Sequence, residues 1–387
     1  MTLDYGELRR RTQERDRSLR EKVMSLGEAA ALVPDGASVG IGGSTLSRTP
    51  MAMVWALIRA GRRDLVCARG ISSSEGELLF ASGASRHLVT SWFSLGIIWG
   101  VSRIMRAYTE SNRARFEEWS HMAMGLRFRA GAMGVPFLPM RAMLGSDVIA
   151  QLPDTRAIDC PFTGEKLVLV PALNPDFALI HVQRCDAYGN AQIDGLPFMD
   201  LDLAMAANRV ILTTERIVSN DQIRRRPDHT KIPFFAVDAV VEVPFGCAPH
   251  ECYGAYEPLF DHLDGYAAAL RPDAEQGMQD YLERYFYGPK SWTDYLTLIG
   301  LSELLDAARR GKSIYDDLRA LHHKQRAARG EERAAIARRA GGVRRRRHPA
   351  IGGDVGAAAA RPGPDHPVRG RHHRRLCRTR PIAAVDQ

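Results

Sequence analysis

The residues best suited to chemistry lie in one glycine-rich segment near the start of the chain. From Asp35 to Pro50 the sequence is DGASVGIGGSTLSRTP, in which Ser38–Ile41 is typical of a buried strand. Glycines directly after a strand let a ligand approach the backbone, and amides there can stabilise an anion or a thioester oxyanion. The segment therefore predicts an anion or acyl site, and a tight turn without a ligand is the alternative.

Five residues of this segment are candidates for contact with a substrate. Gly42 and Gly43 would allow close approach, the hydroxyls of Ser44 and Thr45 could bond a carboxylate, and Arg48 could pair with a carboxylate or phosphate. A surface salt bridge is the alternative for Arg48. The segment lacks the Gly-Lys-Ser/Thr ending of a P-loop, and its glycines do not have the spacing of a dinucleotide fingerprint.

Alternating strands and helices are predicted to position this segment. Apolar residues at helical spacing predict a helix over Leu19–Val33, and Thr49 with Pro50 is typical of the N-cap and first residue of a helix, Pro50–Ala60. Further strands are predicted at Leu65–Ala68, His87–Ser91, Leu167–Val170, Phe177–Val182, Val210–Thr214 and Ala236–Val243. Further helices are predicted at Glu77–Ala81, Asp200–Ala207, Asp273–Phe286 and Ser291–Arg309. The alternation predicts an α/β fold with a largely parallel sheet flanked by helices.

Composition and charge limit the classes of function. The chain has 387 residues, of which 45% are hydrophobic, enough for a packed core. Its formal net charge of +8 comes from residues 341–387, which hold eleven Arg, no Lys and three acidic residues. Residues 1–340 hold 42 basic and 42 acidic side chains, so the folded part is neutral and no nucleic-acid partner is expected.

Four segments are expected along the chain. They are a charged N-terminal extension at 1–20, one domain at 21–320, a charged helical extension at 321–340 and an Arg-rich tail at 341–387. The tail has no Phe, Tyr or Trp and is expected to be disordered. Out-of-frame translation of GC-rich DNA, an RNA- or anion-binding arm and an ordinary flexible tail are the explanations considered.

Neither a membrane location nor a metal site is expected. No apolar run is long enough to span a bilayer and the N-terminus is charged, so the chain is expected to be cytoplasmic. The adjacent residues His250, Glu251 and Cys252 cannot all face one ion, and His181 in its apolar strand is expected to be a core histidine. The cysteines have no CxxC spacing and argue against a zinc site or a disulfide framework: Cys67, Cys160, Cys185, Cys247, Cys252 and Cys377.

The glycine-rich segment resembles the D-x-G-x3-G-x-G-G…P loop in the alpha subunits of family I coenzyme A transferases. The similarity continues in the same order over most of residues 21–300. Its blocks are Gly134–Pro139 with Leu144–Ser146, Pro161–Phe162 with Glu165–Lys166, Ile180–Gln183, Asp186–Asn190, Ile223–Arg225, Val237–Glu242 and Pro249–Gly254. The chain is similar to glutaconate CoA-transferase alpha subunits, and it also resembles the alpha subunit of the CoA hydrolases that open steroid-derived rings.

This resemblance implies the family I fold and a two-step transfer of coenzyme A. A glutamate attacks an acyl-CoA thioester, an acyl-glutamyl anhydride forms, and a glutamyl-CoA thioester then delivers CoA to a second carboxylate. In the family this glutamate belongs to a separate beta subunit, so no catalytic residue is expected in this chain. Acyl-CoA and a carboxylic acid are the expected substrates, a beta subunit is the expected partner in a hetero-oligomer, and no bound cofactor is expected.

A second candidate loop contains Ser73 and Glu75. The stretch Ser73-Ser74-Glu75-Gly76 is superficially similar to the Ser-Glu-Asn-Gly setting of the beta-subunit nucleophile, but no Asn follows the Glu. It falls where alpha subunits of the family carry a small-residue loop facing the partner. Glu75 is therefore considered as a nucleophile, as part of the acyl pocket together with Ser73, or as a solvated loop carboxylate.

Three functions remain open at the level of sequence. The first is CoA transfer, the second is ring-opening hydrolysis of a CoA thioester on the same fold, and the third is non-catalytic binding of acyl-CoA. A glutamate in the partner's nucleophile position would favour transfer, and its absence would favour hydrolysis. The donor, the acceptor and the stoichiometry of the complex cannot be derived from these residues.

Overall fold

The structure is a computed structural model that describes residues 2–96, 98–152 and 155–311. All of these residues belong to one compact unit, Met1–Lys324. The predicted last helix is present, because residues 292–311 are helical. The predicted extension at 321–340 and the Arg-rich tail at 341–387 lie outside the described residues.

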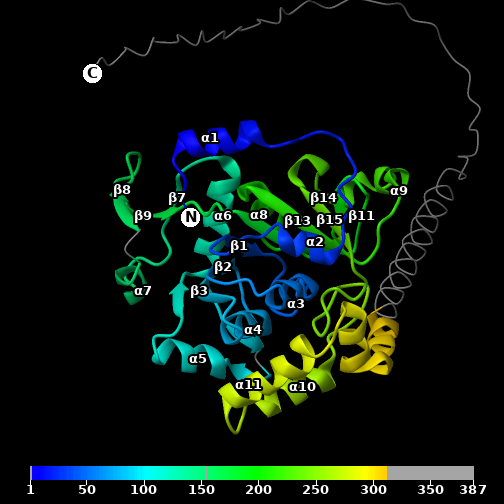
Figure 1. Cartoon of the computed structure of the whole chain (residues 1–387). Helices are drawn as coiled ribbons and strands as arrows, with labels where there is room; N and C mark the ends of the chain where they lie inside the picture. Colours follow the sequence, from blue (N-terminus) through cyan, green and yellow to red (C-terminus); the bar gives the residue numbers. More distant parts are fainter. Residues whose placement is uncertain (1, 97, 153–154, 312–387) are drawn as a thin grey trace, which may run out of the picture. The chain divides into compact units, whose positions relative to one another are not determined.

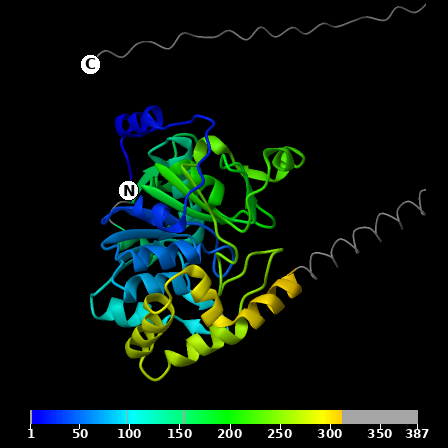
Figure 2. The same cartoon turned by 45° about the vertical axis from the view of Figure 1, so that its right-hand side comes forward.

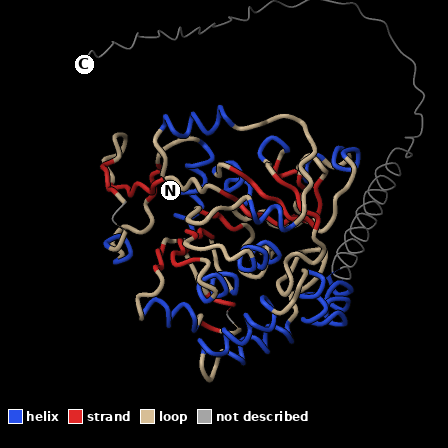
Figure 3. The backbone as a smooth tube through the Cα atoms, in the orientation of Figure 1, coloured by secondary structure: helices blue, strands red, loops and turns tan. Residues whose placement is uncertain are grey.

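A parallel sheet of seven strands forms the centre of this unit (Figures 1 and 3). Every neighbouring pair in it is parallel. The predicted α/β class and largely parallel sheet are confirmed. In spatial order the strands are β15 (Ala239–Glu242), β13 (Arg209–Thr214), β10 (Phe177–Val182), β1 (Ser38–Ile41), β2 (Leu65–Arg69), β3 (Ser85–Thr90) and β6 (Arg115–Glu118).

Helices cover both faces of the sheet and create two hydrophobic cores (Figure 2). Alternate residues of β10 point into different cores. Phe177 and Leu179 belong to the first core, and Ala178 and Ile180 belong to the second. The first core is closed by α2 (Leu26–Ala31), α3 (Met51–Arg59), α4 (Ser74–Ala81), α5 (Arg103–Glu110), α10 (Phe260–Ala269) and α11 (Ala274–Leu282). The second is closed by α6 (His121–Met133) and α8 (Asp200–Ala206).

Smaller elements surround the central sheet. An antiparallel sheet has the order β7 (Phe137–Met140), β9 (Lys166–Pro171), β8 (Arg156–Asp159), and a second has the order β11 (Arg184–Cys185), β12 (Ala191–Gln192), β14 (Thr230–Ile232). The expected turn at Asp186–Asn190 joins β11 to β12, where the Asp186 carboxylate accepts the backbone N–H groups of Tyr188 and Asn190. The remaining elements are α1 (Tyr5–Glu14), β4 (Ser94–Gly96), β5 (Gly100–Val101), α7 (Asp147–Ala150), α9 (Asn220–Arg224), two 3-10 helices at Pro227–His229 and Phe234–Ala236, and a π-helix at Glu283–Tyr287.

The predicted helix over Leu19–Val33 is wrong in its first half. Ser25 and Glu28 form a capping box that begins α2 at Leu26. Before Ser25 the chain is extended and pairs with the last strand of the sheet, since the N–H of Met24 donates to the Val240 carbonyl oxygen at 2.9 Å. The apolar spacing over Leu19–Val33 therefore belongs to an extended segment before Ser25 and to a helix only from Leu26.

Other predicted boundaries shift by a few residues. Helix α3 begins at Met51 and Pro50 is its N-cap, because the Thr49 hydroxyl donates to the Thr45 carbonyl oxygen instead of capping the helix. Helix α4 begins three residues earlier than predicted, at Ser74, and takes Glu75 out of the expected loop. None of the helices among the described residues combines the length and apolar character that a membrane span requires.

Candidate active site

The glycine-rich segment leaves the sheet where the strand order reverses direction. From β1 the chain continues through β2, β3 and β6 on one side, whereas β10, β13 and β15 follow on the other. The N–H of Gly42, directly after β1, donates to the Leu179 carbonyl oxygen of β10 at 2.8 Å. In open α/β sheets ligands bind outside the carboxyl ends of the strands at such a switch point, so the fold places the predicted loop where a site is expected.

The loop closes tightly on its own backbone at Gly43. The N–H of Ser44 donates to the Ser47 carbonyl oxygen at 3.0 Å, and the N–H of Ser47 donates back to Ser44 at 2.8 Å. Gly43 has φ of 69°, and a Cβ atom there would lie 2.2 Å from the Ser47 carbonyl oxygen. A glycine is therefore required here by the path of the loop itself.

The backbone N–H of Gly43, which was expected to face a ligand, is hydrogen-bonded to a carboxylate of the protein itself. The N–H of Gly43 donates to Oδ1 of Asp200 at 2.8 Å, and the other oxygen of Asp200 forms a buried ion pair with Arg48. Arg48 also donates to the carbonyl oxygens of Leu196 at 2.9 Å and His181 at 3.3 Å. The suggestion of a surface salt bridge for Arg48 is wrong, since 1% of its side chain is exposed.

The second predicted loop lies against the first. The Ser73 hydroxyl oxygen lies 3.0 Å from the Thr45 carbonyl oxygen, so the structure brings Ser73 beside the glycine loop. Within that loop Ser44 is buried and Thr45 is half-buried. All seven candidate residues thus lie together at the carboxyl edge of β1 and β2, because Arg48 shares Asp200 with Gly43 and Glu75 is bonded to Ser73.

Glu75 is enclosed by donors of its own chain. Its oxygens accept the Ser72 hydroxyl at 2.6 Å, the Ser73 N–H at 2.9 and 3.0 Å and the Ser73 hydroxyl at 2.8 Å, and Arg69 lies 2.7 Å away. Burial would raise the pKa of Glu75, but the Arg69 charge and these hydrogen bonds hold it below its ordinary value. The solvated-carboxylate alternative is wrong, and in this geometry Glu75 is directed at the protein rather than at an incoming thioester.

A buried polar network extends from Arg69 to His250. Arg69 donates to the Thr49 hydroxyl oxygen at 2.9 Å. The same oxygen lies 2.8 Å from Nδ1 of His250. Because that hydroxyl donates its hydrogen to Thr45, Nδ1 of His250 is the donor, and Nε2 accepts the Ser74 hydroxyl at 2.7 Å. Burial lowers the pKa of His250 to about 3, in agreement with this neutral form. The network ties α4 and the segment after β15 to the glycine loop.

A polar pair at the same edge of the sheet was not predicted from the sequence. The hydroxyl of Ser91, directly after β3, lies 3.1 Å from Nδ1 of His121, the exposed first residue of α6. The next residue, Trp92, is 53% exposed. The expected strand His87–Ser91 ends one residue earlier, and that shift moves Ser91 from the sheet to its carboxyl edge. Only the topology places the end of β3 beside the loop after β2, where the Ser91 N–H donates to the Gly70 carbonyl oxygen at 3.1 Å.

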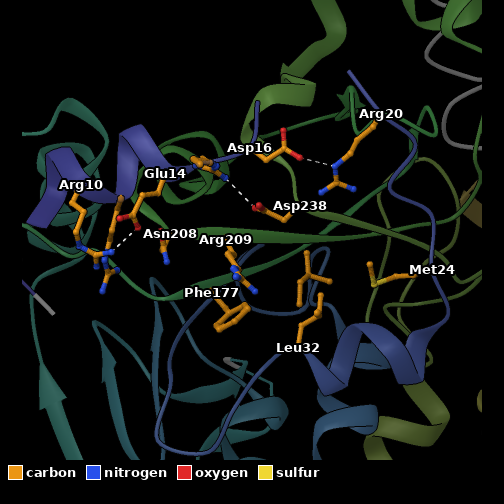
Figure 4. Close-up of a pocket in the computed structure, with 13 residues that line it drawn as sticks. Arg10, Glu14, Asp16, Arg20, Met24, Leu32, Phe177, Asn208, Arg209 and Asp238 are labelled. Carbon is orange, nitrogen blue, oxygen red and sulfur yellow. Dashed lines mark hydrogen bonds and ion pairs between the residues drawn. The ribbon is translucent and has the colours of Figure 1, made fainter. Parts of the chain in front are cut away.

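A separate hollow of about 460 Å³ lies at the opposite, amino edge of the sheet (Figure 4). It lies between α1 and the starts of β10 and β13, where Phe177 and Arg209 line it. Most of its arginines are already paired, as Arg10 is with Glu14 and Arg15 with Asp238. This hollow contains none of the predicted site residues.

The comparisons with known proteins agree with the topology of the site. Residues 23–243 match the sequence profile of the family described as Coenzyme A transferase. The chain belongs to the coenzyme A transferase family. A glutaconate CoA-transferase subunit of Acidaminococcus fermentans is 32% identical over 302 residues, which cover 74% of this chain and 94% of that protein. The crystal structure of glutaconate coenzyme A-transferase from that organism matches with a TM-score of 0.70 at 31% identity, over 74% of this chain and 95% of that chain.

Two further relatives of this family member are named for another activity or are longer. The cholesterol ring-cleaving hydrolase IpdA subunit of Rhodococcus jostii is 30% identical over 294 residues, which cover 70% of this chain and 94% of that protein. A longer protein of Archaeoglobus fulgidus is 38% identical over 300 residues, which cover 76% of this chain but 66% of its own length. The predicted family, its fold and the CoA-transferase class are confirmed, and relatives that are named as subunits indicate a multi-subunit enzyme.

Proposed function

We propose that this chain is the alpha subunit of an enzyme that moves CoA between an acyl-CoA thioester and a carboxylic acid. The observation that carries the proposal is the state of Glu75, the candidate nucleophile on this chain, which is buried and bonded to Ser72, Ser73 and Arg69. A carboxylate held in this way is a structural group. The attacking carboxylate is then supplied by a beta subunit placed against the carboxyl edge of the sheet.

The reaction proceeds by two exchanges at the partner's carboxylate. Its oxygen attacks the thioester carbonyl, CoA leaves as the thiolate, and a mixed anhydride forms. The CoA thiolate then attacks the glutamyl carbonyl of the anhydride and releases the acyl carboxylate. The acceptor carboxylate then attacks the glutamyl-CoA thioester, so that CoA leaves again as the thiolate and a second anhydride forms. The thiolate attacks the acceptor's acyl carbonyl in that anhydride, which gives the new acyl-CoA and frees the glutamate. This scheme needs no bound cofactor, and the CoA thioester is a substrate.

In this proposal the present chain lines one side of the active site and supplies groups that bind the substrate. Thr45 and Ser73 lie together at the switch point, and Ser91 with His121 adds solvent-accessible hydrogen-bonding groups at the same edge. Arg48 is compensated by Asp200, so it shapes the loop and does not attract the substrate anion. The half-buried Thr45 hydroxyl and the exposed His121 imidazole are thus the groups available to bind the acyl portion, because the buried Ser73 hydroxyl is bonded to Glu75.

Ring-opening hydrolysis is the second candidate function. It is favoured by the similarity to a protein named as a ring-cleaving hydrolase and by the Ser91–His121 pair, which gives this chain a polar pair of its own at the edge. Hydrolysis would add water to the substrate and would need no carboxylate acceptor. Non-catalytic binding of acyl-CoA would leave the thioester intact.

Co-expression with the neighbouring reading frame tests the proposal. The purified complex is incubated with a panel of acyl-CoA thioesters, with and without carboxylic acids, and CoA esters are followed by mass spectrometry. A new acyl-CoA that appears only with an acceptor supports transfer, and its loss when the partner's glutamate is changed to glutamine places the nucleophile there. Water addition without an acceptor supports the hydrolase, and unchanged acyl-CoA contradicts both enzymatic proposals.

A further inference from the structure

Four side chains that can bind a metal converge beneath the glycine loop. His181 belongs to β10, Glu215 follows β13, and Cys247 and Cys252 lie in the segment after β15. One ligand atom from each of the four lies within 4.8 Å of the others. His181, Cys247 and Cys252 are fully buried. The sequence hides this cluster, because its members are separated by as many as 71 residues.

Hydrogen bonds to the surrounding protein orient His181 and Glu215 within this cluster, and Oε1 of Glu215, which faces Nε2 of His181, also accepts the Gly246 N–H at 3.2 Å. Nδ1 of His181 lies 2.8 Å from the Thr213 hydroxyl, which directs Nε2 to the centre of the cluster. Oε2 of Glu215 accepts the Phe245 N–H at 2.8 Å, and Oε1 accepts the Tyr256 hydroxyl at 2.6 Å. Hydrogen bonds of this kind orient the ligands in metal sites of proteins.

We propose that His181, Glu215, Cys247 and Cys252 bind a structural zinc ion in a four-coordinate site. Two thiolates and an imidazole favour zinc over the hard cations calcium and magnesium, and four protein ligands are the number that closed structural sites use. The expectation that the cysteines form no zinc site rested on their spacing along the chain. The fold brings two of them together with a histidine and a carboxylate.

Zinc binding exchanges protons of the ligands for a zinc ion and needs no oxidant. Without metal, Nε2 of His181 and Oε1 of Glu215 share a hydrogen bond of 2.8 Å. Zinc displaces the proton of that bond and the two thiol protons, which leave to solvent. Four bonds to the metal then form from Nε2, Oε1 and the two sulfur atoms.

The metal would stabilise the wall of the candidate active site. The cysteine segment is bound to the glycine loop at Glu251, whose N–H donates to Leu46 at 2.9 Å and whose carbonyl oxygen accepts the Arg48 N–H at 2.9 Å. The carbonyl oxygen of Gly246 accepts the Ala52 N–H at 2.9 Å at the start of α3. Zinc would join this segment to β10 and β13, and the inference does not depend on which reaction the enzyme performs.

Elemental analysis of the untagged full-length chain tests the site. Protein made in zinc-supplemented medium and exchanged into metal-free buffer is expected to hold about one zinc per chain. The double variant Cys247→Ala/Cys252→Ala is expected to lose at least about nine tenths of it, because two of the four ligands are gone. The matched control Cys67→Ala removes a buried thiol of β2 and is expected to keep the metal. Equal zinc in the double variant and in Cys67→Ala would overturn the assignment.

Cobalt substitution decides the question without any variant. The chelator-stripped wild-type chain, loaded with cobalt(II), is expected to show thiolate-to-cobalt charge-transfer absorption together with the strong visible bands of tetrahedral cobalt. Absence of both, with no zinc in the purified protein, would show that the cluster is a metal-free hydrogen-bonded group. This readout remains valid if the double variant fails to fold.

Discussion

At the scale of single residues, the site depends on charges that compensate one another inside the protein. Asp200 and Arg48 are both about 1% exposed, and Asp200 also accepts the Gly43 N–H. A buried pair of this kind contributes little net stability over an apolar pair, but removal of one partner leaves an unpaired buried charge. Asp200 therefore positions the glycine loop through Gly43 and Arg48.

The variant Asp200→Asn tests this positioning role. Asparagine retains an oxygen for the Gly43 N–H but leaves Arg48 without a counter-charge, so the free energy of unfolding is expected to fall by about 3 kcal/mol. Urea unfolding measures the change. The control Asp202→Asn lies on the same helix and breaks a mostly exposed pair with Arg129, for which a loss below about 1 kcal/mol is expected. If the two variants lose similar amounts of unfolding free energy, Arg48 does not require a buried counter-charge.

Glu77 makes stability depend on pH near neutrality. Burial raises its pKa from 4.5 to about 7, although hydrogen bonds from Ser102 and Tyr266 oppose the shift. Between these two pH values the unfolded chain has lost the proton while the native chain still holds it. Native stability therefore falls as the pH rises through this window, by about 1.4 kcal/mol per unit at most.

Glu77→Gln removes this titration and keeps the shape of the side chain. The difference in unfolding free energy, variant minus wild type, is expected to increase by about 3 kcal/mol between about pH 5 and about pH 8. Urea unfolding at several pH values measures it. The exposed Glu118→Gln serves as control, and a Glu77→Gln difference that is independent of pH would refute the raised pKa.

The residue types of the glycine loop could be predicted from the sequence, but the groups that they bond could not. The sequence singled out Gly43, Arg48 and Glu75. In the structure each of them is bonded to another group of the protein instead of facing a ligand. The partner of Arg48 is Asp200, 152 positions away, and nothing local indicates that pairing. Glu75 was assigned to a loop because small residues surround it, whereas α4 begins at Ser74 and buries it.

At the scale of elements, the strands of the sheet were the most predictable part. A parallel strand is buried on both faces and therefore appears as a continuous apolar run, which is why Phe177–Val182 is observed as predicted. Strand β6 was missed because it lies at the edge of the sheet and has the sequence RFEE. Its sequence carries no apolar run, so only pairing with β3 identifies it.

The glycine loop as an element can be tested with two matched glycines. Gly43 and Gly36 both have positive φ, of 69° and 77°, but a Cβ atom at Gly36 would meet no atom within 4 Å. Gly36→Ala is expected to cost about 1–2 kcal/mol from backbone strain alone. Gly43→Ala is expected to cost about 1–3 kcal/mol more, because its Cβ collides with the loop backbone, and to abolish turnover of the complex. Equal costs would show that the loop can open to accommodate a side chain.

At the scale of the whole molecule, apolar side chains are exposed around the glycine loop. Leu196 is 71% exposed, and Phe198 and Tyr253 are partly exposed beside it. All three lie close to the loop, since Arg48 bonds the Leu196 carbonyl and lies 5.5 Å from the Phe198 ring centre, while Tyr253 packs against Gly195. Exposed apolar groups beside a site are typical of a surface that another protein covers.

Leu196→Asp tests whether this surface receives the partner subunit. A carboxylate at the centre of an apolar contact would be desolvated without a counter-charge, so the affinity of the complex is expected to fall at least about 100-fold while the isolated chain keeps its thermal midpoint. Leu301→Asp is the matched control, because Leu301 is 57% exposed and belongs to the helical segment 292–311 instead of the glycine loop. Co-purification and titration of each variant with the co-expressed partner measure the effect. If Leu196→Asp binds as tightly as wild type, the partner docks elsewhere, and if Leu301→Asp alone fails, the helical segment is the interface.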